Sequence, residues 1–491
     1  MRCRLEFSAL YKTKEGTLMK ILFAASEALP FAASGGLADV VGSLPAALSD
    51  FDCDCRVVIP LYRSVKPELR NKMTFLGDVT VDVSWRKQYC GVYTIKHGNV
   101  TYYLIDNPYY FMRDGMYGFY DDCERFVFFS RAVLEMLPLI DWKPDIINCN
   151  DWQTAMIPVY YNVMYKYHRE YEGIKTVYTI HNIQYQGVYG REVVTEIMGL
   201  PNYHTNLLEF DGCVNLMKGA IETADKVTTV SPTYAGEVLD PWYSYGMDRA
   251  LVRRQDGIKG ILNGIDIENY NPKTDTVIAK NYSSMGIGGK KKCREALLKE
   301  MGLPLDEAPV IGIVTRLVAH KGIQLIQKVF HEMLDLGCRF VILGSGEKLY
   351  EDFFREMQEQ YPEQVKANIG FLPELSRKIY AGADFFLMPS QNEPCGLAQM
   401  VAMRYGTIPI VRETGGLKDS VNDAGGENGN GFTFKTFDAM DMLDAVKRGL
   451  ALFENKRKWN GLIKRAMNCD FSWNKSAQAY KAMYCEILNE E

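Results

Sequence analysis

The chain has 491 residues, of which 47% are hydrophobic and 24% charged, proportions that are usual for a globular protein. Its 56 basic and 61 acidic side chains give a formal charge of −5 without a long basic run, which argues against nucleic-acid and anionic-membrane partners. No stretch approaches about 18 consecutive apolar residues, so we expect no membrane crossing.

The first predicted element is an N-terminal extension, residues 1–18, which we expect to be disordered before a strand begins at Met19. From Lys20 to about Arg254, short apolar runs alternate with longer helical patterns, which is typical of βαβ units around a parallel sheet. The expected strands are residues 21–25, 56–59, 102–105, 146–149, 176–180 and 227–230.

A second series of the same kind begins at Ile261. Its expected strands are 310–314, 340–343, 385–388 and 408–411, separated by helices such as 322–336 and 397–405. The alternation predicts an α/β protein with two doubly wound, Rossmann-like domains, residues 19–255 and 256–468, and a final segment, residues 469–491. Because ligands of such sheets bind beyond the carboxyl ends of the strands, polar residues that directly follow a strand are the candidate site residues.

Two glycine-rich turns lie at corresponding places in the two domains. Ser34-Gly35-Gly36 comes after the first strand, and Thr414-Gly415-Gly416 comes after the strand that ends at 411. A strand, a tight turn and a helix in this order present backbone N–H groups to anions. A glycine pair can also simply let a helix pack close to a sheet, so both interpretations stay open here.

Seven short motifs, collinear from about Lys20 onwards, resemble those of bacterial glycogen synthases and plant starch synthases. They are Ser34-Gly35-Gly36-Leu37-Ala38-Asp39, Asn150-Asp151-Trp152, Thr179-Ile180-His181-Asn182, Val230-Ser231-Pro232-Thr233, Asn263-Gly264-Ile265-Asp266, Arg316 to Lys321 and Glu393-Pro394-Cys395-Gly396-Leu397. The resemblance implies the GT-B fold, with an interdomain cleft and a last helix that crosses back to the first domain. It also implies a retaining transferase that moves glucose from ADP-glucose to the nonreducing end of an α-1,4-glucan such as glycogen.

Four residues are the candidates for catalysis. Arg316 and Lys321 follow the strand 310–314, and a guanidinium with an ammonium group suits a leaving diphosphate, although both could be surface cations. Glu393 follows the strand 385–388 and could bind sugar hydroxyls or only complement a helix dipole. His181 follows the strand 176–180, and the resemblance implies a place beside the reacting sugar rather than a purely structural role.

The residue patterns and the resemblance together give two binding groups. The donor-binding group is Ser34, Gly35, Gly36, Asn263, Phe371, Cys395, Gly396, Leu397, Thr414, Gly415 and Gly416, with Phe371 expected to stack on adenine. The acceptor-binding group is Asp39, Tyr110, Asp151, Trp152 and Asn182. Trp152 and the aromatic segment that contains Tyr110 either stack on glucan rings or belong to the core.

The chain departs from the family pattern at three places. Ala33 lies where the first loop of the family usually carries Lys, Asn150 where relatives often have His, and Gln391-Asn392 where Arg-Phe is common. Because positive charge is lost, two alternatives stay open. One is a related GT-B transferase that uses UDP-glucose or another acceptor, and the other is a non-catalytic glucan-binding relic.

We expect no metal cofactor. Asp52-Cys53-Asp54 has the Asp-x-Asp form used by metal-dependent transferases, but it directly precedes a strand, where a solvated turn is the simpler interpretation. Arg316 and Lys321 can supply the positive charge that a metal would bring. The 12 cysteines include no Cys-x-x-Cys pair, which favours reduced thiols in the cytoplasm over a disulfide framework or a zinc site.

Overall fold

The computed structural model describes residues 18–254 and 256–489, which form two compact units. The first unit runs to Val230, resumes over Ala235–Gly264 and includes the C-terminal segment from Trp473. The second unit comprises Ser231–Tyr234 and Ile265–Ser472. Apart from Leu18, the N-terminal extension expected at residues 1–18 lies outside the described residues.

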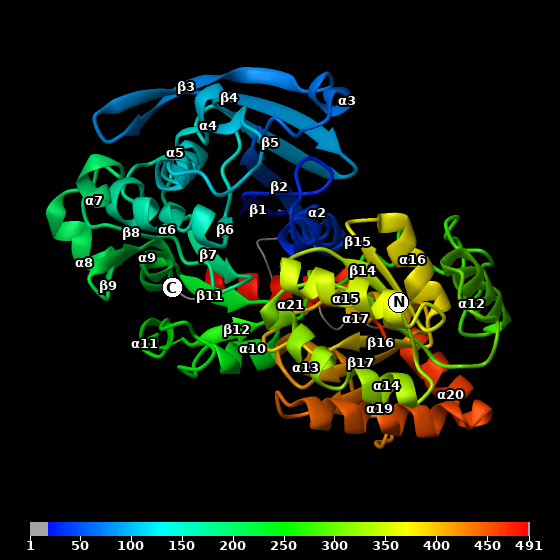
Figure 1. Ribbon diagram of the computed structural model, residues 1–491. Coiled ribbons are helices and arrows are strands. Elements are labelled where there is room, and N and C mark those ends of the chain that lie inside the picture. Colours follow the sequence, from blue (N-terminus) through cyan, green and yellow to red (C-terminus); the bar gives the residue numbers. More distant parts are fainter. Residues whose placement is uncertain (1–17, 255, 490–491) are drawn as a thin grey trace. The chain divides into compact units, whose positions relative to one another are not determined.

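A nine-stranded sheet forms the centre of the first unit, in the order β12-β11-β7-β6-β1-β2-β5-β4-β3 (Figure 1). Its strands are β1 (Met19–Ala24), β2 (Cys53–Pro60), β3 (Thr74–Val83), β4 (Arg86–His97), β5 (Val100–Asp106), β6 (Ile146–Asn150), β7 (Lys175–Ile180), β11 (Lys226–Thr229) and β12 (Ile258–Gly260). Pairing is parallel from β12 to β5 and antiparallel between β5, β4 and β3. The central strands β1, β6 and β7 are almost wholly buried, because helices cover both faces of a parallel sheet.

Helices and a small sheet complete the first unit. The helices are α2 (Gly36–Leu48), α3 (Pro67–Arg70), α4 (Pro108–Phe111), α5 (Asp122–Glu135), α6 (Met156–Tyr160), α7 (Val193–Glu196), α8 (Thr205–Leu208), α9 (Leu216–Thr223), α11 (Asp248–Leu251) and α21 (Trp473–Asn489). The small sheet has the order β8-β10-β9, with β8 (Val188–Tyr189), β9 (Glu209–Phe210) and β10 (Cys213–Asn215). Helix α10 (Pro232–Glu237) begins in the second unit and ends in the first.

The C-terminal helix α21 is part of the core of the first unit. It packs against α2, and Trp473, Tyr480 and Tyr484 lie in one buried cluster with residues of β1 and β2. The hydroxyl of Tyr484 donates to Asn148 Oδ1 of β6 at 2.7 Å, and Asn148 Nδ2 donates to Thr179 Oγ1 of β7 at 3.0 Å. A polar chain therefore joins the last helix to the two strands that precede Asp151 and His181.

Replacing Tyr484 with Phe is expected to lower the free energy of unfolding by about 1–2 kcal/mol, because Asn148 Oδ1 would lose its donor inside the core. Chemical denaturation measures this change. Tyr167→Phe is the control, since the Tyr167 side chain is 87% exposed and its replacement should be close to neutral. Equal stabilities of the two variants would show that the buried hydrogen bond contributes nothing net.

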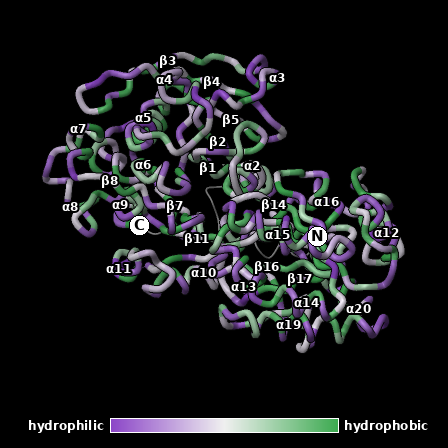
Figure 2. The backbone as a smooth tube through the Cα atoms, viewed as in Figure 1, coloured by the Kyte–Doolittle hydropathy of each residue, from purple (hydrophilic) through white to green (hydrophobic). Residues whose placement is uncertain are grey.

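The second unit is built on a six-stranded parallel sheet in the order β15-β14-β13-β16-β17-β18. Its strands are β13 (Val310–Val314), β14 (Arg339–Gly344), β15 (Val365–Ile369), β16 (Phe385–Met388), β17 (Ile408–Arg412) and β18 (Phe432–Phe434). Its helices are α12 (Gly288–Met301), α13 (Ile323–Lys328), α14 (Phe330–Asp335), α15 (Lys348–Gln360), α16 (Pro373–Gly382), α17 (Ala398–Arg404), α18 (Gly415–Ser420), α19 (Ala439–Phe453) and α20 (Lys456–Met467). Hydrophilic and hydrophobic residues alternate along α19 in Figure 2, as expected of a helix with one buried face.

The two parallel sheets confirm the predicted α/β class, but the units divide at other residues than expected. Strand β12 pairs with β11, so the first unit continues past 255 to Gly264. The Ile265 N–H donates to the Phe471 carbonyl, which keeps the segment before Trp473 in the second unit. The helix expected at 322–336 is two helices, α13 and α14, because the backbone leaves the helical region at Val329.

Candidate active site

In the first unit, the loop between β1 and α2 is held by the buried carboxylate of Glu27. This carboxylate accepts a hydrogen bond from the Ser34 N–H and another, at 3.2 Å, from the Ser34 hydroxyl. Burial is the largest cause that raises the pKa of Glu27. Ser34, Gly35 and Gly36 are exposed, and Asp39 is half-buried in the first turn of α2. The Ser34 N–H, for which anion binding was one of two open interpretations, therefore binds a side chain of the protein itself.

The predicted residues Asp151, His181 and Asn182 meet at the carboxyl ends of β6 and β7. Asp151 Oδ1 accepts hydrogen bonds from the His181 N–H at 2.7 Å and the Asn182 N–H at 3.3 Å. The Asp151 N–H in turn donates to the Thr179 carbonyl at 3.0 Å. Asp151 has a φ of 57°, which is uncommon for a residue with a side chain and typical of functional sites. The carboxylate thus fixes the backbone that carries His181.

The imidazole of His181 is held by the strand that precedes Asp151. Its Nε2 lies 2.9 Å from Asn150 Oδ1, and Asn150 is the buried last residue of β6. Burial lowers the pKa of His181 to about 3. The ring is therefore neutral at physiological pH, which suits a hydrogen-bonding role and excludes a resident imidazolium.

Burial also raises the pKa of Asp151 to about 7, and the negative charge of Glu27 adds to this effect. The ordinary pKa of an aspartate side chain is about 3.9. The contribution of Asp151 to the free energy of unfolding is therefore complete below about pH 4 and is lost as the pH rises towards 7. Asp151→Asn removes the titration. We expect the unfolding free energy of the variant, relative to the wild type, to increase between about pH 4 and about pH 7. A difference that does not change with pH would contradict the raised pKa.

Trp152 is half-buried, so it is neither a core residue nor a fully exposed one. Its ring meets Phe126 edge to face at a centroid distance of 5.2 Å and Tyr189 at 6.2 Å. Gly187 lies beneath the ring, where a Cβ atom would come within 2.7 Å of it. This packing holds Trp152 in one orientation and leaves part of its side chain exposed.

The structure does not support Tyr110 as an acceptor-binding residue. Its side chain is fully buried, and its hydroxyl donates to Glu124. Its ring packs at 5.0 Å from Phe128. Tyr110 is therefore a core residue, which was one of the two interpretations of the aromatic segment, because helix α4 turns the Tyr110 ring inward against α5. Tyr117, in the same segment, is placed differently: its hydroxyl lies 2.7 Å from Ser26 Oγ, directly before Glu27.

In the second unit, Lys321 and Glu393 form a direct ion pair. Lys321 Nζ lies 2.6 Å from Glu393 Oε2, and the Ser390 hydroxyl donates to the same oxygen at 3.0 Å. These residues follow β13 and β16, which are neighbours in the sheet. Gly322 has a φ of 77° and lets the Lys321 loop lie close to the backbone of Pro389. A Cβ atom at Gly322 would lie 2.0 Å from the Pro389 carbonyl oxygen.

Arg316 is the exposed cation of the same loop. Within residues 18–254 and 256–489, its guanidinium forms no ion pair. His320 lies between Arg316 and Lys321 in sequence, and burial first, then the charges of Lys321 and Arg316, lower its pKa. The loop therefore presents a positive group that the carboxylate of Glu393 does not neutralise.

The second glycine turn supports Glu393 rather than presenting its Gly416 N–H to an anion. That N–H donates to the carbonyls of Glu393 at 3.2 Å and Pro394 at 3.1 Å. A Cβ atom on Gly415 would lie 2.0 Å from the Glu393 carbonyl oxygen, and one on Gly416 would lie 2.1 Å from the Cys395 carbonyl oxygen. Gly416 thus packs closely against the backbone of the Glu393 turn. Thr414 is fully buried behind it.

The remaining donor-binding candidates occupy different environments. Cys395 is buried, and Gln399 Nε2 donates to the carbonyls of Cys395 at 3.3 Å and Gly396 at 2.9 Å. Leu397 is half-buried directly before α17. Phe371 follows β15 and is 87% exposed, as a ring available for stacking would be. Asn263 belongs to the first unit and is buried, and its Oδ1 accepts no hydrogen bond from any described residue.

Sequence reasoning missed the structural roles of Glu27, Ser231 and Thr233. The Ser231 hydroxyl donates to the Pro394 carbonyl at 2.7 Å, and the Thr233 N–H donates to Asp419 Oδ2 at 2.8 Å. Both contacts lie within the second unit. Ser231 and Thr233 stood in a recognised motif but without an assigned role. Glu27 lies shortly after the first strand, and this position could have identified it as a candidate site residue.

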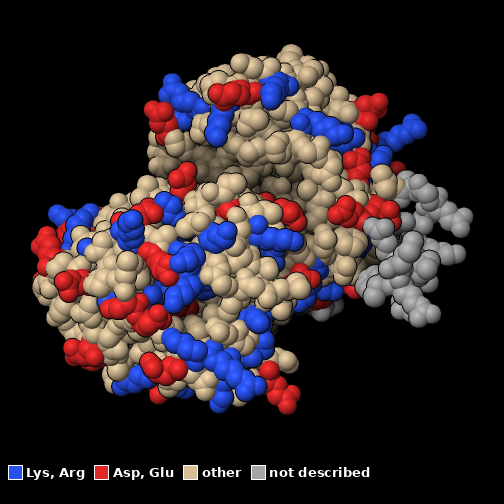
Figure 3. All heavy atoms as spheres, turned by 90° about the vertical axis from the view of Figure 1, so that its right-hand side faces the viewer, with Lys and Arg blue, Asp and Glu red and all other residues tan. Residues whose placement is uncertain are grey.

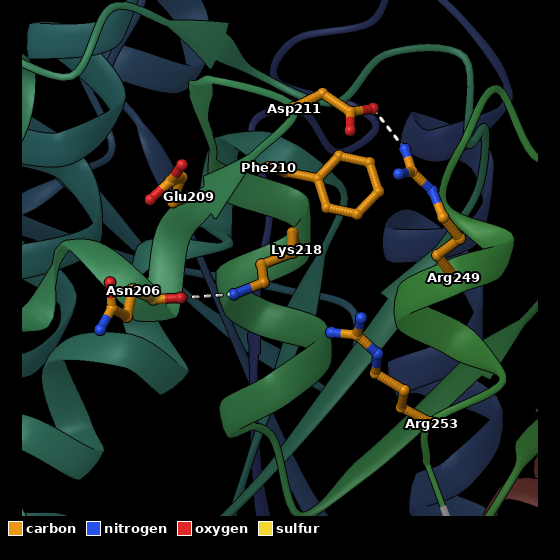
Figure 4. Close-up of a pocket in the computed structure, with 7 residues that line it drawn as sticks. All are labelled: Asn206, Glu209, Phe210, Asp211, Lys218, Arg249 and Arg253. Atoms are coloured by element: carbon orange, nitrogen blue, oxygen red, sulfur yellow. Dashed lines mark hydrogen bonds and ion pairs between the residues drawn. The ribbon is translucent and has the colours of Figure 1, made fainter.

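A separate cavity of about 380 Å³ in the first unit contains none of the predicted site residues (Figure 4). It is lined by Asn206, Glu209, Phe210, Asp211, Lys218, Arg249 and Arg253. Arg249 is paired with Asp211, and Lys218 Nζ contacts the Asn206 carbonyl at 2.7 Å and Glu222 at 2.9 Å. Because most of its positive groups are already neutralised, this cavity is a poor match for a nucleoside diphosphate.

Two negative findings concern residues 18–254 and 256–489. No three His, Cys, Asp or Glu side chains gather as a metal site would require. In the same ranges no helix has the length and apolar character needed to span a bilayer. On the face shown in Figure 3, basic and acidic side chains are interspersed.

Comparison with known proteins begins at the level of the fold. A family model described as glycosyl transferases group 1 matches residues 297–465. The solved sucrose-phosphate synthase from Thermosynechococcus elongatus aligns with 96% of this chain and 100% of its own at a TM-score of 0.61, but with 16% identity, so this likeness concerns the fold alone. The chain thus has the fold of the GT-B glycosyltransferases.

Closer relatives are found at higher identity. A family model described as starch synthase catalytic domain matches residues 20–253. Glycogen synthase from Geobacillus thermodenitrificans is 47% identical over 478 residues, covering 96% of this chain and 99% of that protein. Glycogen synthase from Desulforamulus reducens is 48% identical over 476 residues, covering 96% and 99%. The catalytic domain of starch synthase IV from Arabidopsis thaliana, solved bound to ADP and acarbose, has a TM-score of 0.89 and 34% identity, covering 97% and 100%. The chain belongs to the glycogen and starch synthase family.

Proposed function

We propose that the chain transfers glucose from ADP-glucose to the nonreducing end of an α-1,4-glucan with retention of configuration. The bond between C1 of glucose and the diphosphate oxygen breaks, and its electron pair leaves with ADP. The terminal 4-hydroxyl oxygen of the glucan forms the new bond to C1, and its proton passes to the departing phosphate oxygen. The starch synthase IV domain solved with ADP and acarbose supports this choice of donor and acceptor.

The observation that carries the proposal is the arrangement of Arg316, Lys321 and Glu393 at the carboxyl ends of β13 and β16. Transfer requires positive charge beside the leaving diphosphate and a polar partner for the glucosyl group, whose C1 becomes electron-poor. Two cations and a carboxylate on neighbouring strand ends meet both requirements. Glu393 Oε2 contacts Lys321 Nζ at the place that we infer for the phosphate of the donor.

We infer that the donor exchanges these partners. The diphosphate carries more negative charge than one carboxylate, so Lys321 Nζ turns to it and Glu393 becomes available to sugar hydroxyls. Ser390 keeps its bond to Glu393 Oε2 and holds the side chain in place during the exchange. The exposed guanidinium of Arg316 completes the contact with the diphosphate.

The missing cations at Ala33 and at Gln391-Asn392 do not remove this arrangement. Gln391 bonds through its backbone, its N–H donating to the His320 carbonyl at 2.9 Å and its carbonyl accepting from Arg412 Nη1 at 2.6 Å. The first bond ties the loop before Glu393 to the loop that carries Lys321, and the second ties it to the end of β17. No lysine at position 33 is needed for the pair of cations in the second unit.

In the first unit, we propose that Asp151, Trp152, Asn182 and Asp39 bind the glucan and that His181 contacts the transferred sugar through its neutral ring. The open part of the Trp152 indole offers a face for one glucose unit. Ser34, Gly35 and Gly36 remain donor-loop candidates through their exposed backbone. Tyr117 replaces Tyr110 as the aromatic residue of the site, since its hydroxyl faces Ser26.

The test is incorporation of label from ADP-[¹⁴C]glucose into glycogen, with UDP-[¹⁴C]glucose in parallel and Glu393→Gln as the inactive control. We expect incorporation from ADP-glucose that β-amylase releases as maltose, which identifies α-1,4 linkages at nonreducing ends. Incorporation from UDP-glucose alone would correct the donor. Binding of glycogen without incorporation from either donor would overturn the proposed activity and identify a glucan-binding relic.

A further inference from the structure

The side-chain amide of Asn150 has a defined orientation. Asn150 is 2% exposed, and its Nδ2 donates to the carbonyls of Ala24 at 3.0 Å and Asn148 at 3.1 Å. Both partners are acceptors, so the opposite orientation of the amide would place oxygen against oxygen. The amide oxygen Oδ1 therefore faces His181, with Nε2 of the ring at 2.9 Å.

This orientation determines which nitrogen of His181 carries the proton. An amide oxygen only accepts hydrogen bonds, so Nε2 must donate. The ring is neutral, because burial holds the pKa of His181 far below physiological pH. A neutral imidazole has one N–H, so Nδ1 is left without a proton and acts as an acceptor.

Backbone contacts make the ring position equally well defined. Asn150 and Asp151 are consecutive residues, and they hold the ring and the backbone N–H of His181 respectively, the latter at 2.7 Å. Thr154 Oγ1 donates to the Asn150 carbonyl at 2.9 Å, which fixes the end of β6 itself. One strand end thus sets both the orientation and the tautomer of the histidine.

We propose that Asn150 is a positioning residue, which holds His181 as the Nε2–H tautomer so that Nδ1 accepts a hydrogen bond from a hydroxyl of the transferred glucose or the glucan. This inference rests on the proposed function for the identity of the ligand. It excludes His181 as a proton donor in the reaction, since the one N–H of the ring is used by Asn150.

Nuclear magnetic resonance of enzyme labelled with [¹⁵N]histidine reads the tautomer directly. The chain has 6 histidines, and His181→Gln identifies the resonance that belongs to His181. In the wild type we expect a protonated Nε2 and an unprotonated Nδ1 throughout the neutral pH range. In Asn150→Ala we expect a mixture of tautomers, with turnover from ADP-glucose to glycogen reduced about 10- to 100-fold by the loss of orientation.

Asn162→Ala is the matched control. Asn162 Nδ2 also donates to two backbone carbonyls of the first unit, those of Pro158 at 3.0 Å and Thr223 at 2.8 Å, but its amide does not contact a histidine. This variant should lose comparable stability and keep both the His181 tautomer and the turnover number. Asn150→Asp is the second test, because a carboxylate beside Nε2 should raise the pKa of His181 and bring its titration into view.

The outcomes separate the two hypotheses. A wild-type His181 protonated at Nδ1, or an unchanged tautomer in Asn150→Ala, would overturn the role of Asn150. A changed tautomer with normal turnover would also overturn it, because the tautomer would then not matter for the reaction. If the wild type transfers no glucose at all, the proposed function fails, while the resonances still decide whether Asn150 sets the tautomer.

Discussion

The Lys321→Ala variant is expected to lose at least about a hundredfold in turnover number, because one preorganised positive group at a developing charge is worth roughly 3–4 kcal/mol. The measurement is steady-state transfer from ADP-glucose to glycogen at saturating concentrations of both substrates. Lys291→Ala is the control, since Lys291 belongs to α12 and its side chain is 68% exposed. A normal turnover number for Lys321→Ala would exclude the proposed role.

This variant also tests whether the ion pair supports the fold. Glu393 is buried, and removal of Lys321 leaves its carboxylate without the cation that neutralises it. We therefore expect a lower melting temperature for Lys321→Ala and a partial recovery in Lys321→Ala/Glu393→Gln, where the uncompensated charge is also removed. Recovery of stability without recovery of turnover would separate the structural role of the pair from its catalytic role.

The second large effect is expected for Gly415→Ala. Gly415 has a φ of 43°, and a Cβ atom would lie 2.0 Å from the Glu393 carbonyl oxygen, so the backbone of the Glu393 turn must move. We expect the free energy of unfolding to fall by more than about 3 kcal/mol and transfer to be lost together with it. Thermal and chemical unfolding, followed by the transfer assay, measure the two effects.

Gly35→Ala is the matched control from the other glycine turn. Gly35 has an extended φ of −163°, and nothing lies within 4 Å of the position of its Cβ atom. The free energy of unfolding of Gly35→Ala should therefore differ from that of the wild type by no more than about 0.5 kcal/mol. Comparable destabilisation by the two substitutions would contradict the conclusion that only the second turn is packed against a neighbouring backbone.

The parallel strands of both units were predictable because each is a short, continuous apolar run between polar segments. Residues 146–149 and 310–314 correspond closely to β6 and β13 for this reason. Strands β3 and β4 were not predicted, since many of their residues are exposed and their pattern contains Tyr, Lys and Asp. The short strand β12 has only half-buried residues, so the end of the first unit was placed too early.

Lys321, Glu393, Asp151 and His181 became candidate site residues because a strand end and a motif coincide at each of them. The ion pair and the Asp151 contacts depend on neighbouring strands, whose order the sequence does not contain. Tyr110 was placed in the site because aromatic residues surround it, and only the packing of α4 on α5 shows that its ring is turned inward. Asn150 stood out as a departure from the family pattern, but its contact with His181 required the structure.

The two glycine turns show how similar sequences can have different surroundings. Both consist of a glycine pair after an apolar strand, and both begin a helix. The first is exposed and bound to Glu27 through Ser34, whereas the second is buried under the Glu393 turn. Burial of the surrounding backbone distinguishes the two turns, and the local sequence does not reveal it.

A crystal structure of the enzyme with ADP tests the central claim most directly. The account predicts that the guanidinium of Arg316 and the ammonium group of Lys321 both lie within hydrogen-bonding distance of the diphosphate, with the Lys321–Glu393 pair opened. A diphosphate bound elsewhere, with Lys321 still paired to Glu393, would contradict it.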